Sequence, residues 1–553
     1  MKSDFNLYIS ALTLALASSQ AFAAEAPDAG RTLQETKPTI APPRVSPSID
    51  IEVPALSEAM PGGDSVLLQS VTFSGNTIYD TNVLNNALGD NTGKSYDLAG
   101  LKGLANIITS YYREHGYPFA RAFVPAQPMK DGNLRIEIIE GKYGKVTANG
   151  DEKLATSAQQ FLTQLQSESV IDSKLLERTT LLLDDLPGIK TTPIIRPGQM
   201  IGTGDLDVKV ERDSRFGGEV GFDNYGNRYT GRNRARASLH IDSPFILGDQ
   251  ITVSGLYTEE DMWLGNLGYS LPVGHSGLRA NVGYAHTYYE LGQEFANLKA
   301  NGTAKISNLG LTYPIVRSQQ TNLSVAANYQ YKRLNDQQDV AGTDNSKSSH
   351  SLPITLNFDH RDTWAGGGVT YGGISWTHGD LSLDSGLRAT DRTTAKTTGS
   401  YDKINLDLAR LQMLPANFTL YGRVSAQWSN ENLDSSESFG LGGANGVRAY
   451  PSGEGYGDEG WLTQLELRYN TVVKDATLTP YAFYDSGRVR INHHTWDTAD
   501  NYRSVSGAGL GLRGSYSRVT ADASLAWRLY GGDPKSDTKD YSPMAWFNLV
   551  YRF

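Results

Sequence analysis

The sequence contains no cysteine. This absence excludes disulfide scaffolds, cysteine-ligated zinc and thiol nucleophiles. Basic charge is also scarce, because 50 Lys and Arg residues stand against 60 Asp and Glu, which gives a formal net charge of −10. A nucleic-acid-binding protein needs a basic surface to neutralise phosphates, so we expect no nucleic-acid partner.

Long apolar runs are missing beyond the N-terminus. No later stretch reaches the roughly 18 apolar residues that a membrane-spanning helix needs. Residues 1–24 differ, with Lys2 followed by the apolar core "YISALTLALA" and the small residues "AFAAEA". This order is typical of a secretory signal peptide, with a disordered or anchoring N-terminus as the alternative. An exported chain of this kind is periplasmic, secreted or a β-barrel.

Signals of catalysis are also missing. The sequence has no G-x-S-x-G, no H-E-x-x-H and no glycine-rich phosphate loop, and its 9 histidines are scattered. We therefore expect no enzyme, no cofactor and no metal site. The chain is instead rich in glycine (57) and tyrosine (30), with 39% hydrophobic residues. That mixture favours many turns and aromatic-rich strands over a thick apolar core.

Residues 25–65 are rich in Pro, Ala, Ser and Glu, which predicts an extended linker. Near its start, "PDAGRTLQET" can form one short helix with Asp28 as its N-cap. So short a helix is marginal in water and needs a surface to pack on, so disorder is the alternative.

Residues 66–142 and 143–213 repeat one order of predicted elements: a strand, helices and two further strands. In the first copy the helical spacing is clearest in "LAGLKGLANIITSYY", and the strands read "LLQSVTFSG", "FARAFVP" and "LRIEIIEG". Two consecutive copies indicate a duplicated small α+β module, each with an unpaired strand edge.

Residues 214–553 lose helical periodicity and alternate apolar and polar residues in about sixteen short segments. In "TQLELRYN", for example, Leu465 and Leu467 oppose Gln464 and Glu466. A soluble sandwich gives the same alternation, but rarely over so many strands, whereas a closed barrel in lipid leaves no sheet edge. The last strand carries an outward aromatic face and ends on Phe553. Outer-membrane barrels present a terminal strand of this kind to the barrel-assembly machinery.

The segment 440–460 is a glycine-rich loop between barrel strands that carries a single arginine, Arg448. On a later strand, alternation places Asp485 on the face opposite Leu478 and Tyr484. If the apolar face meets lipid, Asp485 points into the lumen and needs a cation. We expect Arg448 to supply it, in a pair of roughly 1.5–3 kcal/mol, with Gly487 leaving room for the loop.

These residues carry a resemblance. "VRAY" (Val447, Arg448, Ala449, Tyr450) together with "FYDSG" (Phe483 to Gly487) resembles the paired signature of the outer-membrane transporters of two-partner secretion, the haemolysin and filamentous-haemagglutinin branch. The duplicated modules resemble the polypeptide-transport-associated (POTRA) domains of the larger superfamily of barrel insertases. One departure is visible, because the family usually has glycine where this chain has Ala449, and alanine fits unless its φ is positive.

The resemblance implies a sixteen-stranded barrel in the bacterial outer membrane, with POTRA modules 66–142 and 143–213 in the periplasm. The loop 440–460 would fold into the lumen, and the N-terminal helix would plug it. The modules would receive an unfolded exoprotein, which would thread the pore without ATP and fold outside. A barrel-assembly insertase and a passive porin are the alternatives, and Arg448 with Asp485 could simply brace the barrel.

Overall fold

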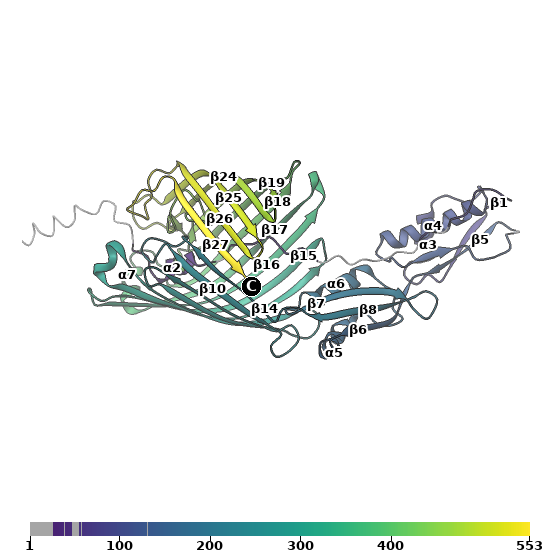
Figure 1. Ribbon diagram of the computed structural model, residues 1–553, viewed down its shortest axis with the longest axis horizontal. Helices are drawn as coiled ribbons and strands as arrows, with labels where there is room; N and C mark the ends of the chain where they lie inside the picture. Colours follow the sequence, from purple (N-terminus) through teal and green to yellow (C-terminus); the bar gives the residue numbers. More distant parts are fainter. Residues whose placement is uncertain (1–25, 38, 47–54, 57, 130) are drawn as a thin grey trace, which may run out of the picture.

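The computed structural model describes residues 26–37, 39–46, 55–56, 58–129 and 131–553. The predicted signal peptide, residues 1–24, lies outside the described residues, as does part of the predicted linker. A large strand barrel forms one end of the molecule, and two small modules follow one another from its mouth (Figure 1). No helix within the described ranges is long and apolar enough to cross a membrane.

The short N-terminal helix α2 (Ala29–Glu35) is present, and it begins where the sequence predicts. Asp28 is its N-cap, because its carboxylate accepts a hydrogen bond of 2.9 Å from the Arg31 backbone N–H. The cap satisfies one of the donors that a helix start leaves open. The helix lies inside the barrel, against β13 to β15 (Figure 1).

The first module packs two helices on a three-stranded sheet in the order β2-β5-β4, with β2 and β5 parallel. Leu101, Leu104, Ile108 and Tyr112 of the longer helix face the sheet and form the core. Leu98, on the same helix, stays exposed. The elements are β1 (Val66–Leu67), β2 (Ser70–Ser74), α3 (Thr81–Leu88), β3 (Ser95–Tyr96), α4 (Leu98–Glu114), β4 (Arg121–Phe123) and β5 (Asn133–Ile139).

The second module repeats the plan with a sheet in the order β6-β8-β7. Its core lies between the sheet and the helices, around Leu176, Leu206 and Val208. The elements are β6 (Lys142–Gly150), α5 (Glu152–Phe161), η1 (Leu162–Gln164), α6 (Ser173–Asp184), β7 (Ile189–Pro197) and β8 (Thr203–Arg212).

The barrel closes with antiparallel pairing throughout. β22 and β23 both pair with β24 and form one strand interrupted at Asn470, so the barrel has sixteen strands, as the sequence predicts. The strands are β9 (Phe216–Asp223), β10 (Arg234–Asp242), β11 (Gln250–Thr258), β12 (Trp263–Pro272), β13 (Arg279–Glu290), β14 (Ala300–Arg317), β15 (Thr321–Gln338), β16 (Thr343–Asp362), β17 (Gly368–Leu383), β18 (Gly399–Met413), β19 (Phe418–Ser429), β22 (Glu459–Tyr469), β23 (Thr471–Val473), β24 (Ala476–Arg490), β25 (Tyr502–Tyr516), β26 (Val519–Tyr530) and β27 (Met544–Arg552).

Short elements lie in the connections between strands. They are η2 (Gln293–Leu298), η3 (Trp364–Gly366), α7 (Ser385–Asp391), η4 (Ser435–Glu437), β20 (Phe439–Gly440) and β21 (Tyr456–Gly457). The last three belong to the long connection between β19 and β22, which holds the predicted inward loop.

Along the strands, apolar side chains face outward and polar side chains face the lumen, as the sequence predicts. Leu465 and Leu467 are exposed on the outer wall, whereas Gln464 and Glu466 are buried inside. The C-terminal strand β27 presents its aromatic face outward, ending with the exposed Phe553. Its register with β9 closes the barrel over only five residue pairs.

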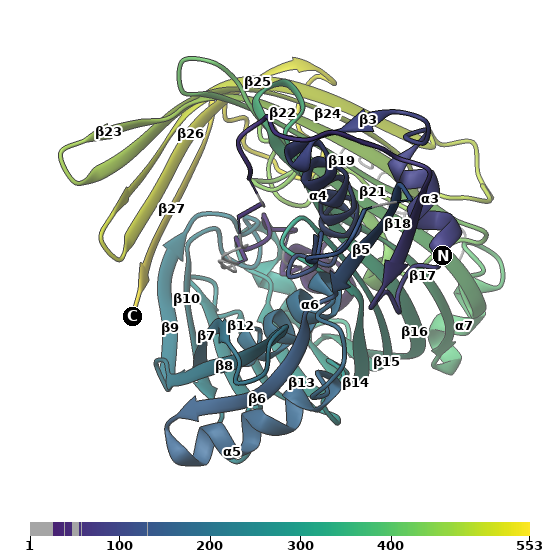
Figure 2. The ribbon, with the colours of Figure 1, turned by 90° about the vertical axis from the view of Figure 1, so that its right-hand side faces the viewer.

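The second module is fixed to the barrel rim by two arginines. Arg178 of α6 donates to the carbonyl oxygen of Pro314 over 2.7 Å. Arg317 of β14 holds both oxygens of Asp185 at 2.7 Å. The modules therefore stand at the mouth of the barrel, as Figure 2 shows from their side.

Candidate functional site

The loop 440–460 folds into the barrel and packs on its inner wall. Leu441, Val447, Ala449 and Tyr450 are all buried, in one cluster with Leu462 of β22 and with side chains of β24 and β25. The pairing of β20 with β21 closes the base of the loop. The Val447 N–H donates to the Leu441 carbonyl over 2.7 Å, which folds the loop back on itself.

Arg448 lies against Asp485, the partner that the sequence predicts for it. Nε of Arg448 is 2.8 Å from one carboxylate oxygen of Asp485, and Nη2 is 2.7 Å from the other. The Arg448 backbone N–H adds a third bond of 3.1 Å to the same carboxylate. Both residues are buried, with Asp485 fully so. A bidentate guanidinium–carboxylate pair of this kind fixes orientation as well as charge.

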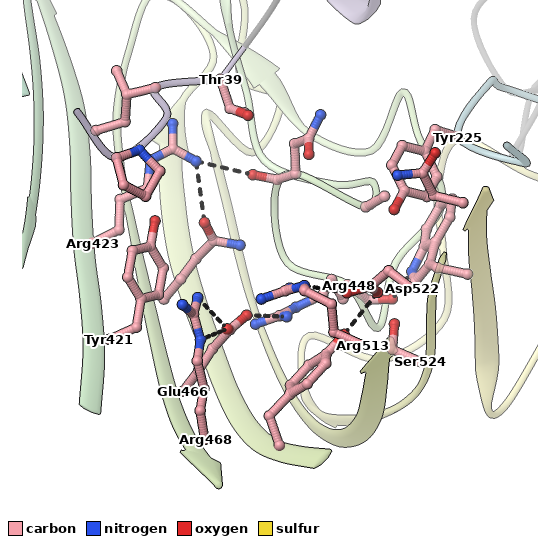
Figure 3. Close-up of a pocket in the computed structure, with 18 of the residues that line it drawn as sticks. Thr39, Tyr225, Tyr421, Arg423, Arg448, Glu466, Arg468, Arg513, Asp522 and Ser524 are labelled. Carbon is pink, nitrogen blue, oxygen red and sulfur yellow. Dashed lines mark hydrogen bonds and ion pairs between the residues drawn. The ribbon is translucent and has the colours of Figure 1, made fainter. Parts of the chain in front are cut away.

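The arginine has a second carboxylate partner that the sequence does not predict. Nη1 of Arg448 is 2.5 Å from Glu466 of β22, and the other oxygen of Glu466 binds Arg468 at 2.6 Å. Figure 3 shows Glu466 between the two arginines. Two carboxylates thus meet two guanidinium groups inside the barrel. The alternation in "TQLELRYN" gives the inward direction of Glu466, but not its distance from the loop.

The remaining motif residues hold the loop by packing. The guanidinium carbon of Arg448 lies 3.6 Å from the centre of the Phe483 ring. The Tyr450 hydroxyl donates to the carbonyl oxygens of Tyr530 and Gly532, each over 2.9 Å. A Cβ on Gly487 would lie 2.7 Å from Leu441, so glycine is needed where the loop approaches the wall.

Glu454 anchors the far end of the loop, although the sequence does not predict this role. Its carboxylate binds Arg503 of β25 at 2.7 Å and accepts hydrogen bonds from the backbone N–H groups of Lys535 and Ser536, each over 2.9 Å. The only signal in the sequence is an acidic residue within a glycine-rich segment.

Helix α2 docks on the same long connection. Asp28 and Asp434 share the ammonium group of Lys347, at 2.9 and 2.7 Å. A Cβ on Gly30 would lie 2.2 Å from Oγ of Ser435, so the helix and η4 touch closely. At the helix end, Glu35 accepts a bond of 2.6 Å from Asn227.

Buried ion pairs hold η4, on which α2 packs, against the barrel wall. Glu437 of η4 contacts the ammonium groups of Lys332 on β15 and Lys403 on β18. All three side chains are buried. The docking surface of α2 and most of the inward loop therefore belong to one connection, residues 430–458 between β19 and β22.

The chain after α2 runs through the lumen without regular structure. Thr39, Ile40 and Pro42 line a cavity of about 350 Å³ together with Tyr421 and Arg448 (Figure 3). A second cavity of about 340 Å³ lies beside the loop and the end of α2.

The chain then leaves the lumen along the barrel rim. Arg361 donates to the carbonyl oxygens of Pro43 and Arg44 over 3.1 and 2.9 Å. Arg317 donates to Oγ of Ser46 over 2.9 Å. Arg317 therefore contacts both the linker and the second module.

The sequence profile described as "Haemolysin secretion/activation protein ShlB/FhaC/HecB" matches residues 202–514, and the profile "POTRA domain, ShlB-type" matches residues 66–141. This chain belongs to that haemolysin secretion family. The predicted family, barrel fold and outer-membrane location are thereby confirmed. Members of the family are outer-membrane transporters that secrete a partner exoprotein, and this chain is one of them.

Individual relatives are distant but cover most of the chain. It is 26% identical to the heme/hemopexin transporter protein HuxB of Haemophilus influenzae, over 86% of this chain and 84% of that protein. It is 22% identical to the outer membrane transporter CdiB of Dickeya dadantii, over 87% and 86% of the two chains. The solved structure of CdiB from Escherichia coli matches with a TM-score of 0.75 at 20% identity and covers 95% of each chain, which shows the fold.

Proposed function

We propose that the barrel conducts one unfolded exoprotein of the haemolysin or adhesin type from the periplasm to the cell surface. The POTRA modules receive it, and folding outside the cell drives transport without ATP. A chain that has folded at the surface cannot slide back through the pore.

The observation that carries this proposal is the extended segment 39–46. It occupies the lumen and the rim as a passing polypeptide would, held through its main chain by Arg361. Main-chain contacts of this kind are independent of side-chain identity, as a conduit for a long unfolded chain requires. The segment therefore marks a path along which the exoprotein would run once the linker has moved.

The small size of the two cavities beside the inward loop supports a plug role for α2. The cavities beside the loop are about 350 and 340 Å³ in volume, and the helix and the inward loop fill the space between them. Transport would require α2 to leave its contacts with Lys347 and Ser435. The Arg448–Asp485 pair would keep the loop in a defined position while the helix leaves.

Of the four outer strand edges in the modules, β2 fits the exoprotein best. Thr109 covers the edge of β4 by accepting from the Ala122 N–H over 2.9 Å. The β6 edge is covered by Gln159 and by residues 168–170, and β7 carries two prolines. Within the described ranges, no such group covers the outer edge of β2 (Ser70–Ser74), so an extended segment could add there as a further strand.

The remaining partner proposals concern the membrane. The outward apolar face of the barrel would contact outer-membrane lipid. The exposed aromatic face that ends at Phe553 would be the signal read by the barrel-assembly machinery. Both follow from the exposure of these side chains on the outer wall.

The test co-expresses this chain with a neighbouring reading frame that encodes a large exported protein. We expect that protein in the culture supernatant or on the cell surface only when this chain is present. Export without this chain contradicts the proposal. Failure of other barrels to assemble in its absence would instead favour an insertase.

A further inference from the structure

A long apolar groove of about 800 Å³ crosses the outer wall of the barrel from β11 to β15. Its floor is formed by residues that pair with one another across five neighbouring strands. From β11 to β15 they are Ile251, Tyr269, Val282, Leu309 and Tyr329. The small side chain of Ser307 keeps it open at its upper end, between Tyr284 and Tyr331.

The groove climbs the wall toward the extracellular side. Ile251 is the second residue of β11, counted from the end at the modules, whereas Tyr329 is the ninth of β15, counted from the same end. Barrel strands tilt by about 35–45°, so a path across them rises through the membrane. An acyl chain lying in the upper part of this groove, around Leu309 and Tyr329, would therefore run toward the outer headgroups.

Three nitrogen-bearing side chains face outward from the barrel just above the groove, two residues farther from the modules than Tyr284, Ser307 and Tyr331 on their strands. His286, Lys305 and Arg333 are successive register partners, and Lys305 and Arg333 are exposed. Arg333 is held in place, because its Nε donates to the Tyr331 hydroxyl over 2.7 Å and its guanidinium lies 5.3 Å from that ring centre. The cationic row is therefore fixed directly against the upper end of the groove.

Among the described residues, the two charged members of this row, Lys305 and Arg333, have no acid within ion-pair distance. In the described part of the chain, the partner of Arg333 is the Tyr331 side chain and not a carboxylate, and Nε2 of His286 is buried without a hydrogen-bond partner. Trp263 and Trp376 are exposed on the outer wall, and exposed aromatic side chains of this kind mark a membrane interface in outer-membrane barrels. Lys305 and Arg333 are each the thirteenth residue of their strand counted from the module end, four residues beyond Leu309 and Tyr329, which places them toward the outer headgroups.

We propose that this surface binds a phosphorylated glycolipid of the outer leaflet, with one acyl chain in the groove and a headgroup phosphate on Lys305 and Arg333. A guanidinium fork and an ammonium group side by side match the charge and geometry of phosphate. The cations lie on the side of the membrane away from the modules. The lipid must therefore belong to the outer leaflet, where the anionic species carry phosphorylated sugars.

The test reconstitutes the full chain in nanodiscs containing lipid A, dephosphorylated lipid A or phosphatidylglycerol, and counts the retained lipid by native mass spectrometry. We expect wild type to retain lipid A in preference to the other two. The double variant Lys305→Gln/Arg333→Gln should retain lipid A roughly tenfold less. The matched control Arg388→Gln/Arg392→Gln, which removes two exposed charges at α7, should retain it as wild type does.

A second pair of variants tests the groove without changing charge. Ser307→Phe fills the upper end and should release lipid A, whereas Ala280→Phe, outside the groove on β13, should not. A heat-modifiable band on denaturing gels verifies that each barrel is folded. Unchanged retention in Lys305→Gln/Arg333→Gln or in Ser307→Phe overturns the proposal, and so does equal retention of phosphatidylglycerol.

Discussion

Ala449 of the inward loop packs directly on Gly507 of β25, where a Cβ would lie 2.2 Å from the Ala449 Cβ. Ala449 does not have a positive φ, so alanine is unstrained there. The resemblance leads one to expect glycine at 449. In this chain the Ala449 methyl group has room because Gly507, on the wall that the loop packs against, has no side chain.

We predict that Gly507→Ala unseats the loop, because overpacking of a tight contact costs about 1–3 kcal/mol. The added methyl would also lie 2.9 Å from the Trp527 carbonyl oxygen, so Ala449→Gly should restore only part of the loss. Ala449→Gly alone should be tolerated. Tryptic cleavage at Arg448, which is buried in the seated loop, measures the effect. Full protection of Arg448 in Gly507→Ala would contradict the prediction.

We predict that Arg448→Ala strongly reduces export of the partner while the barrel still inserts. Removing the guanidinium leaves Asp485 buried without a cation and Glu466 with Arg468 alone, a loss of about 3–5 kcal/mol for the contact. Adding Asp485→Asn to the Arg448→Ala protein should recover part of the lost export, because no uncompensated carboxylate then remains at residue 485. Arg488→Ala is the matched control, because it removes an exposed arginine from the same strand as Asp485.

Partner in the supernatant and heat-modifiable barrel in the membrane fraction are measured together for each variant. Normal export by a membrane-inserted Arg448→Ala protein would sink the prediction. If instead the barrel itself fails to insert, the pair braces the wall and has no separate role in transport.

The direction of Asp485 could be predicted from the sequence because alternation along a strand has a period of two, so one apolar neighbour fixes the face. The same rule places Glu466 inside. It gives no register between strands, and so it could not show that Arg448 reaches both carboxylates.

The contacts of Gly507 and Glu454 depend on the path of the loop, which no local pattern encodes. The docking of α2 on η4 is a contact between segments some 400 residues apart, and the only local sign is Asp28 as a helix cap. Family resemblance, not periodicity, led to the expectation of a plug.

We predict that Gly30→Leu expels α2 and raises the single-channel conductance of the pore in planar bilayers. The larger side chain cannot fit against Ser435, where even a Cβ would lie at 2.2 Å. Deleting residues 25–40 should raise conductance in the same way and leave export intact. Ala55→Leu, at an exposed linker residue beyond the segment that lines the lumen cavity, should conduct as wild type does. Unchanged conductance in both Gly30→Leu and the deletion would argue against a plug.

We predict that the first module loses stability in acid through Glu140. Burial raises the pKa of this carboxyl, but hydrogen bonds from Thr77, Ile78 and Tyr112 outweigh it and leave the pKa below its usual range. A lowered folded-state pKa stabilises the module above the unfolded value of about 4.3, and this stability is lost as pH falls through the folded value.

Urea unfolding of the full chain in detergent, followed by circular dichroism at 222 nm, tests this, since the helices of the modules dominate that signal. Glu140→Gln should lower the urea concentration at the unfolding midpoint at pH 7. It should also weaken the fall of that midpoint as the pH drops below 5. Glu137→Gln changes a less buried acid on β5, three residues before Glu140, and should behave as wild type. A wild-type midpoint that is independent of pH would contradict the prediction.

We predict that the exoprotein adds to the outer edge of β2. A photo-crosslinking residue at the exposed Thr72 should capture the partner during co-expression, whereas the same residue at the exposed Asn85 of α3 should not. The reason is geometric, because the main-chain groups of an edge strand can pair with an extended chain and the surface of a helix cannot. Capture at Asn85 but not at Thr72 would move the receiving surface to the helices, where exposed Leu98 and Ile107 of α4 offer an apolar alternative.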